Sequence, residues 1–208
     1  MADDHAVRRC SAGDVRFVFH QRADLVGEVL VPASDLADID PAAYARAMAK
    51  YDDTPVRRRL RDTVIPGLGR RWTEVVFLSP VHPHAIWRAW RDVRGKELPR
   101  AEFWAIPADD LPRATVVLDR TISAVGDPIE PAEVAPFDPA SFTSAMEVPA
   151  ANRAWLEEMV RRGVSGAWFH GIPHVLAPGA VPLHRAHVIS WEQDIDSNVG
   201  LDGREQMF

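Results

Sequence analysis

Histidine is the residue type whose spacing points most clearly to chemistry in this chain. Of the eight histidines, six form three close pairs: His82/His84, His170/His174 and His184/His187. Imidazole is a common metal ligand and also titrates near neutral pH, so it serves both metal binding and proton transfer. The pair 170/174 has helical spacing, but an intervening glycine and proline disfavour a helix there. Because HExxH and CxxC motifs are absent, we assign no metal ligands.

The stretch LSPVHPHAIW, residues 78–87, places a serine and two histidines at the corner between a strand and a helix. Proline has no N–H, so Ser79-Pro80 ends the strand. We predict that His82 is accessible and functional, whereas His84 is structural and, in the first helical turn, either satisfies free N–H groups or rests on an indole. The predicted catalytic residues are therefore His82, Ser79, His170 and His174.

A third position of interest is His20, near the end of the alternating segment VRFVFHQ, residues 15–21. Period-two alternation is typical of a half-buried strand. Since His20 and Ser79 both stand where strands end, we expect them to line one cleft. Trp72 and Trp104 are predicted to wall that cleft and to stack on a flat ring.

The elements that position these residues predict an α+β fold. Asp40-Pro41 and Thr54-Pro55 each combine an N-cap with a first-turn proline, which favours two helices. We predict that the second helix buries Val56, Leu60 and Val64. Further helices are expected over 83–95 and 149–163, the latter burying Trp155, Leu156, Met159 and Val160. Strands are expected over 15–21, 72–79 (central), 101–107, 114–120 and 184–192, with a kinked segment at 167–183 and no regular structure over 121–148.

Together these elements predict a single globular domain over residues 1–192. Its centre would be one twisted sheet, mixed or antiparallel, flanked by short helices. The polar tail 193–208 is expected to be disordered.

Composition narrows the classes of partner. The chain is 47% hydrophobic with a net charge of −6, which argues against a surface coated for nucleic acid. The basic cluster Arg57–Arg71 could contact nucleic-acid phosphate, but we interpret it as a solvated helix face. Cys10 is the only cysteine, and neither a membrane-spanning run nor a signal pattern is found. We expect a cytoplasmic protein without membrane association.

Two resemblances add to this reading. The run YDDTPVRRRLRDTVIPGLGRRWTEVVFLSPVHP, with the later PHVLAPG at 173–179, resembles a family of small, uncharacterised bacterial proteins. Their shared pattern is IP.L, a tryptophan before an apolar strand, SP.HP and PH.L..G. That family implies no activity.

The order of elements also resembles the DNA-modifying ADP-ribosyltransferase toxins. That resemblance implies NAD binding at Phe19-His20, a midway strand ending in Ser79-Pro80, and a later strand ending in Asp119. It departs from the pattern where Gln21 and Arg22 replace the threonine after the first histidine. No catalytic glutamate is found before the last strand.

The preferred hypothesis is an enzyme with a histidine-lined cleft for a small polar or nucleotide-like substrate. On the toxin resemblance, His20 and Asp119 would contribute to holding such a ligand, with NAD as a candidate substrate. Trp72 and Trp104 would stack on its ring. One alternative is a metal-dependent hydrolase using the same histidines. The other is a non-enzymatic accessory or immunity protein that binds a partner through the acidic segment 121–148.

Overall fold

The computed structural model describes residues 16–22, 28–95, 97–164 and 167–193. It confirms the predicted α+β class, with antiparallel strand pairing throughout its named ladders. The expected tail lies outside the described residues except for Gln193. In the described ranges, every helix is too short or too polar to cross a membrane.

The first sheet has three strands in the order β1-β6-β11. β1 is Phe17–Gln21, β6 is Glu102–Pro107 and β11 is His187–Ser190. The predicted strand is confirmed, and its neighbouring residues Phe19 and Val18 pack into different hydrophobic clusters. The expectation that it is half-buried is wrong, because both residues are buried. Both faces of this sheet are therefore covered.

The second sheet has four strands in the order β5-β9-β7-β8. β5 is Val76–Leu78, β7 is Val116–Leu118, β8 is Val134–Pro136 and β9 is His174–Ala177. Two further ladders pair β2 (Val29–Leu30) with β10 (Val181–Pro182), and β3 (Val64–Ile65) with β4 (Arg70–Arg71). The segment 167–183, predicted only to be kinked, thus supplies a strand with neighbours on both sides.

One isolated bridge joins the two larger sheets. The Phe19 N–H donates to the Ser79 carbonyl at 2.9 Å, and the Ser79 N–H donates to the Phe19 carbonyl at 2.7 Å. β5 is an edge strand of its sheet, and this bridge places β1 beside the edge that β9 does not occupy. In place of the one central sheet expected from the sequence, the structure has two small sheets that meet at this bridge.

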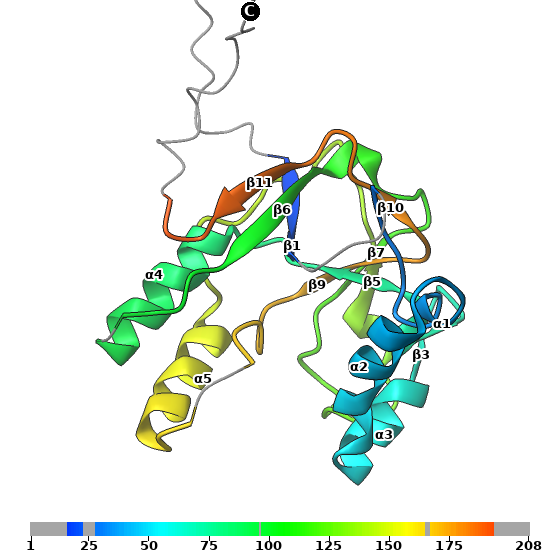
Figure 1. Ribbon diagram of the computed structural model, residues 1–208. Coiled ribbons are helices and arrows are strands. Elements are labelled where there is room, and N and C mark those ends of the chain that lie inside the picture. The colour runs from blue at the N-terminus through cyan, green and yellow to red at the C-terminus, as the bar shows by residue number, and fades with distance from the viewer. Residues whose placement is uncertain (1–15, 23–27, 96, 165–166, 194–208) are drawn as a thin grey trace, which may run out of the picture.

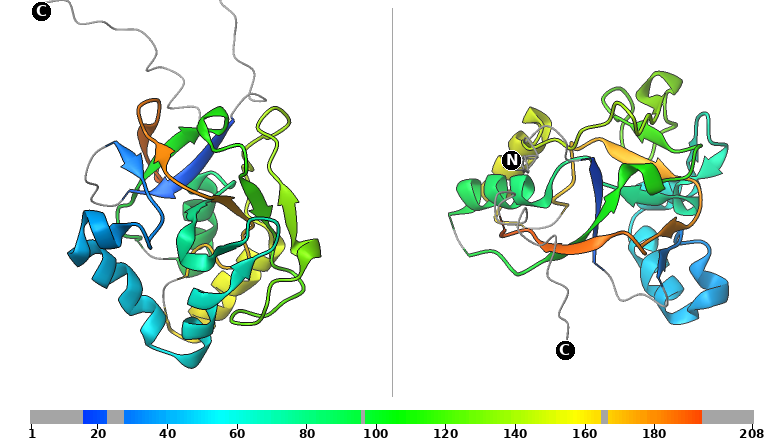
Figure 2. Two further views of the ribbon diagram at one scale, coloured as in Figure 1. Left: turned by 90° about the vertical axis from the view of Figure 1, so that its right-hand side faces the viewer. Right: turned by 90° about the horizontal axis from the view of Figure 1, so that it is seen from above.

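The helices form two groups on opposite flanks of the strands (Figure 1), a separation that is also visible from above in Figure 2. One group packs α4 (Pro83–Arg94) against α5 (Ala150–Arg161), and the other contains α1 (Leu36–Ile39), α2 (Pro41–Asp52) and α3 (Pro55–Asp62). The predicted caps are confirmed: Asp40 accepts from the Ala43 N–H, and Thr54 accepts from the Arg57 N–H. The 3-10 turns are η1 (Trp72–Glu74), η2 (Ala108–Asp110) and η3 (Pro131–Glu133).

The hydrophobic core lies where the first sheet meets α4 and α5. Trp90, Phe103, Leu156 and Trp191 are fully buried there beside Phe19. Three predicted burials are wrong: Val56 is 39%, Val64 54% and Val160 38% exposed. α3 is short enough that Leu60 alone anchors its apolar side, and Val64 has already left the helix for β3.

The segment 121–148 is more ordered than its composition predicts. It contains η3 and β8, and its far end is tied back to β1 and the Ser-Pro corner. The Ser144 hydroxyl donates to the Phe17 carbonyl at 2.6 Å, and the His82 N–H donates to the Ala145 carbonyl at 2.9 Å. The expectation of no regular structure is wrong for 131–136, where nonlocal pairing with β7 outweighs the weak local propensity.

A buried carboxylate organises the start of this segment. Glu133 accepts hydrogen bonds from the Ser123 hydroxyl and from the N–H groups of Ile122, Ser123 and Glu130. Burial raises the pKa of Glu133, but these hydrogen bonds outweigh it and lower the pKa to about 2. The ionised side chain thus serves as the acceptor that holds the loop closed.

Replacing this carboxylate should destabilise the fold. Glu133→Gln loses the charge that four donors share, so we expect unfolding free energy to fall by about 1–3 kcal/mol in urea at pH 7. The pKa of Glu133 is lower in the folded protein than its ordinary value of 4.5. The loss of unfolding free energy in the variant should therefore reach its full size above pH 4.5 and shrink as the pH falls toward about 2. The exposed Glu147→Gln is the control; equal losses in both variants would contradict this role.

Candidate functional site

A cleft of about 760 Å³ lies between the ends of β1 and β5 and the helix α2. That volume falls in the range typical of small-molecule sites. The structure brings four of the predicted site residues to this cleft: His20, Trp72, Ser79 and His174. The Phe19–Ser79 bridge explains the meeting of His20 and Ser79, because it pairs the residue before His20 with Ser79.

His20 lines the cleft with an uncompensated polar atom. Its Nδ1 is buried and has no hydrogen-bond partner. Burial lowers the pKa of His20; a backbone hydrogen bond at Gln21 opposes this shift, and the charge of Lys50 adds to it. The imidazole is therefore neutral at pH 7.

His174 begins β9 and reaches the cleft from the second sheet. Its ring meets the edge of Phe77, with centroids 5.6 Å apart. Burial lowers the pKa of His174 to about 4, and His170 contributes to the shift. This imidazole is also neutral at pH 7, so it can donate through one nitrogen and accept through the other.

Ser79 borders the cleft, but its hydroxyl is engaged in the turn. Ser79 Oγ donates to the Val81 carbonyl at 3.0 Å and accepts from the Val81 N–H at 3.1 Å. The side chain is buried. These bonds close the Ser-Pro corner, which favours a structural role for a residue predicted to be catalytic.

His82 does not line the cleft, and the prediction that it is accessible is wrong. The residue is only 4% exposed, and its ring meets the Phe19 ring with centroids 4.9 Å apart. Nδ1 of His82 accepts the His84 N–H at 3.2 Å, so it caps α4. The helix must begin at Pro83, and the preceding imidazole is the acceptor that satisfies its first turn. His84 rests on Trp87 as predicted, with ring centroids 5.2 Å apart.

The remaining predicted residues lie outside the cleft lining. His170 stacks on Trp155 with ring centroids 4.1 Å apart and acts on His174 only through its charge. Trp104 pairs across the strands with His20 and lies beneath the guanidinium of Arg22. Asp119 is exposed at the end of β7, where its N–H donates to the Glu133 carbonyl. Asp119 follows the end of β7, as expected, but it is not among the residues that line the cleft.

Several lining residues were not predicted from the sequence. Arg46 and Lys50 reach the cleft from α2, Tyr51 follows them, and Phe169 enters from the segment after α5. The spacing of Arg46 and Lys50, four residues apart on one helix, was the available signal. From the sequence alone, Arg46 and Lys50 could not be told from ordinary solvated cations, because the strands that build the cleft beside them are distant along the chain.

A buried amide holds the chain that carries Phe169. The Asn152 side chain in α5 donates to the carbonyls of Trp168 and His170, at 2.8 and 2.7 Å. The two bonds fix the backbone on either side of Phe169. This clamp connects α5 to Phe169, which lines the cleft. Its second acceptor, His170, lies four residues before His174.

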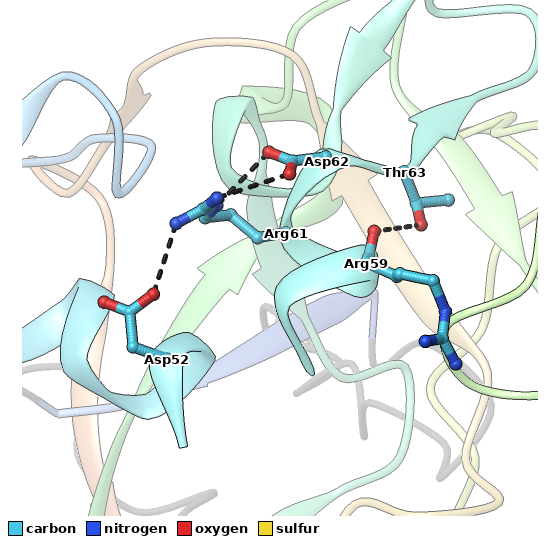
Figure 3. Close-up of polar contacts among 5 residues, drawn as sticks. All are labelled: Asp52, Arg59, Arg61, Asp62 and Thr63. Carbon is cyan, nitrogen blue, oxygen red and sulfur yellow. Dashed lines mark hydrogen bonds and ion pairs between the residues drawn. The ribbon is translucent and has the colours of Figure 1, made fainter. Parts of the chain in front are cut away.

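Two arginines of the basic cluster are paired with nearby carboxylates. Arg61 pairs with Asp52 at 3.3 Å and with Asp62 at 3.2 Å (Figure 3). Arg57 pairs with Asp53 at 2.9 Å. The Thr63 hydroxyl donates to the Arg59 carbonyl at the end of the same helix. These contacts favour the solvated-face interpretation over a nucleic-acid surface.

Within the described ranges, no group of three or more histidine, cysteine, aspartate or glutamate side chains could hold a metal ion. The hydrolase alternative therefore gains no metal centre from this part of the chain. Comparisons with models of protein families, with curated proteins and with solved structures found no match.

The capping role of His82 can be tested by a pair of substitutions. His82→Ala removes the acceptor at the start of α4 and a ring packed on Phe19, so we expect a stability loss of about 1–2 kcal/mol or more. His82→Asn keeps an acceptor suited to an N-cap and should recover part of that loss. Chemical unfolding measures both variants. If His82→Ala is as stable as wild type, the capping account is wrong.

Proposed function

We propose that the protein is an enzyme that acts on a small polar or nucleotide-like substrate in this cleft. The observation that carries the proposal is the convergence of two neutral imidazoles, His20 and His174, on one cavity of ligand size. Neutral, partly desolvated imidazoles are typical of sites where protons are moved or a developing charge is stabilised. The single cysteine, which precludes an intrachain disulfide, is in keeping with a cytoplasmic setting.

His174 is the proposed acid/base residue. A neutral imidazole accepts a proton from a substrate or donates a hydrogen bond without a prior change of charge. A pKa of about 4 makes it a weak base in the free protein. A negatively charged substrate beside it would raise this pKa toward neutrality and so activate it on binding.

His20 is proposed to bind rather than to react. The residue lines the cleft and its buried Nδ1 lacks a partner, which a substrate hydroxyl or oxygen would supply once the ring turns toward the ligand. Trp72 packs on Phe77 with centroids 4.5 Å apart, and both line the cleft. This pair offers an aromatic surface for a flat ring.

ADP-ribosyl transfer from NAD is the reaction class implied by the resemblance of Phe19-His20 and Ser79-Pro80. The cleft lining described by the structure contains no aspartate or glutamate. A transferase at this site would therefore depend on His174 instead of the glutamate used by those toxins. We retain the toxin-like reaction only in this histidine-dependent form.

A second candidate is a partner-binding protein that uses the segment 121–148. Ile122 is 65% and Val125 46% exposed within it, and apolar side chains on an ordered loop are typical of contact surfaces. This candidate predicts that loss of Ile122 and Val125 abolishes function while loss of His174 has no effect. The enzyme proposal predicts the reverse.

Ligand binding to single-histidine variants tests the proposal. Thermal-shift and calorimetric titrations would use NAD, ADP-ribose and nucleoside mono- and diphosphates, followed by mass spectrometry for turnover. We expect a ligand that stabilises wild type to bind His20→Asn at least about tenfold more weakly, because a buried polar contact is lost. His174→Asn should abolish turnover with smaller loss of binding.

The control is His184→Asn, which changes an exposed histidine outside the cleft. It should match wild type in both assays. If no compound in the panel binds, or if all three variants bind and react as wild type does, the enzyme proposal is wrong.

A further inference from the structure

The lining of the cleft carries charge of one sign only. Arg22, Arg46 and Lys50 line it, whereas no aspartate or glutamate appears among its described lining residues. The chain as a whole has a net charge of −6. A cavity with three cations in an acidic protein is a local inversion of charge, which concentrates anions at that place.

Two of these cations are left unpaired by the rest of the described structure. Arg46 and Lys50 lie one turn apart on α2 and form no ion pair with any described residue. Lys50 lies over the ring of its neighbour Tyr51, 5.1 Å from the ring centre. Arg57 and Arg61, which follow in the sequence and lie outside the cleft lining, are by contrast paired with aspartates.

The third cation is held in place from outside the cleft. Arg22 donates to Glu102 at 2.6 Å, and its guanidinium lies 5.5 Å from the centre of the Trp104 ring. Glu102 does not line the cleft. The wall therefore offers three cations, beside a His20 whose Nδ1 is buried without a hydrogen-bond partner.

We propose that Arg46, Lys50 and Arg22 form a subsite for the phosphate group of a small phosphorylated molecule. Phosphate oxygens suit the fork of an arginine and the point charge of a lysine, and a neutral imidazole donates one further hydrogen bond. The remainder of the ligand would extend toward Trp72 and His174. This subsite rests on the proposed function, since it lies in the same cleft and names the class of substrate.

A small molecule fits the observations better than a nucleic acid does. The cleft holds about 760 Å³, which suits one ligand of nucleotide size. Of the arginines that would extend the cationic surface along α3, Arg57 and Arg61 are paired with aspartates, which interrupts that surface. A polynucleotide would need a continuous unpaired track.

The test uses inorganic pyrophosphate as the probe, titrated calorimetrically into wild type at low salt. We expect saturable binding that weakens as salt rises. The double variant Arg46→Gln/Lys50→Gln should bind roughly tenfold or more weakly, since each charge-assisted contact contributes a factor of that order. The control Arg100→Gln/Arg113→Gln removes the same charge from exposed positions outside the cleft and should change affinity less than about twofold.

Absence of saturable binding, or equal losses in both double variants, would overturn the subsite. A short single-stranded oligonucleotide that displaces pyrophosphate and binds more tightly than a nucleoside diphosphate would overturn the small-molecule assignment. The two proposals fail separately. Pyrophosphate binding without turnover of any nucleotide contradicts the enzyme alone, and turnover unaffected by Arg46→Gln/Lys50→Gln contradicts the subsite alone.

Discussion

The pair of backbone hydrogen bonds between Phe19 and Ser79 is the constraint on which the site depends. They join the middle of β1 to the residue that follows β5 and so connect two small sheets that otherwise have separate ladders. The last residues of β1 therefore run past the corner where β5 ends. His20 and the Ser79 corner are brought to the cleft directly, and His174 arrives through the pairing of β9 with β5. α2 closes the opposite side and brings the cations.

Burial around this cleft explains the state of both imidazoles. Desolvation disfavours the charged form of each, and neighbouring positive groups act in the same direction: Lys50 on His20, and His170 on His174. The cleft thus holds cations on its rim and neutral nitrogens inside. A bound anion would oppose both effects, since it attracts the cations and favours protonation of the histidines. Ligand binding and histidine protonation are therefore coupled in this account.

Local signals in the sequence predicted the elements whose boundaries are set locally. The strand β1 and the caps at Asp40 and Thr54 were confirmed because they depend on nearest neighbours. β8 and β9 were missed, since their short runs lie among prolines and glycines and are strands only through distant partners. His82 was assigned to chemistry because its proline corner resembled an accessible loop. Its capping bond and its contact with Phe19 depend on where the first sheet lies.

A pH titration of the imidazole nitrogens by NMR tests the central claim most directly. The account predicts that His174 titrates near its folded value of about 4 and His20 below the ordinary 6.5. Saturating pyrophosphate should raise both pKa values, and much less so in Arg46→Gln/Lys50→Gln. If both histidines titrate near the ordinary value and neither responds to pyrophosphate, the cleft is not the desolvated, anion-binding site described above.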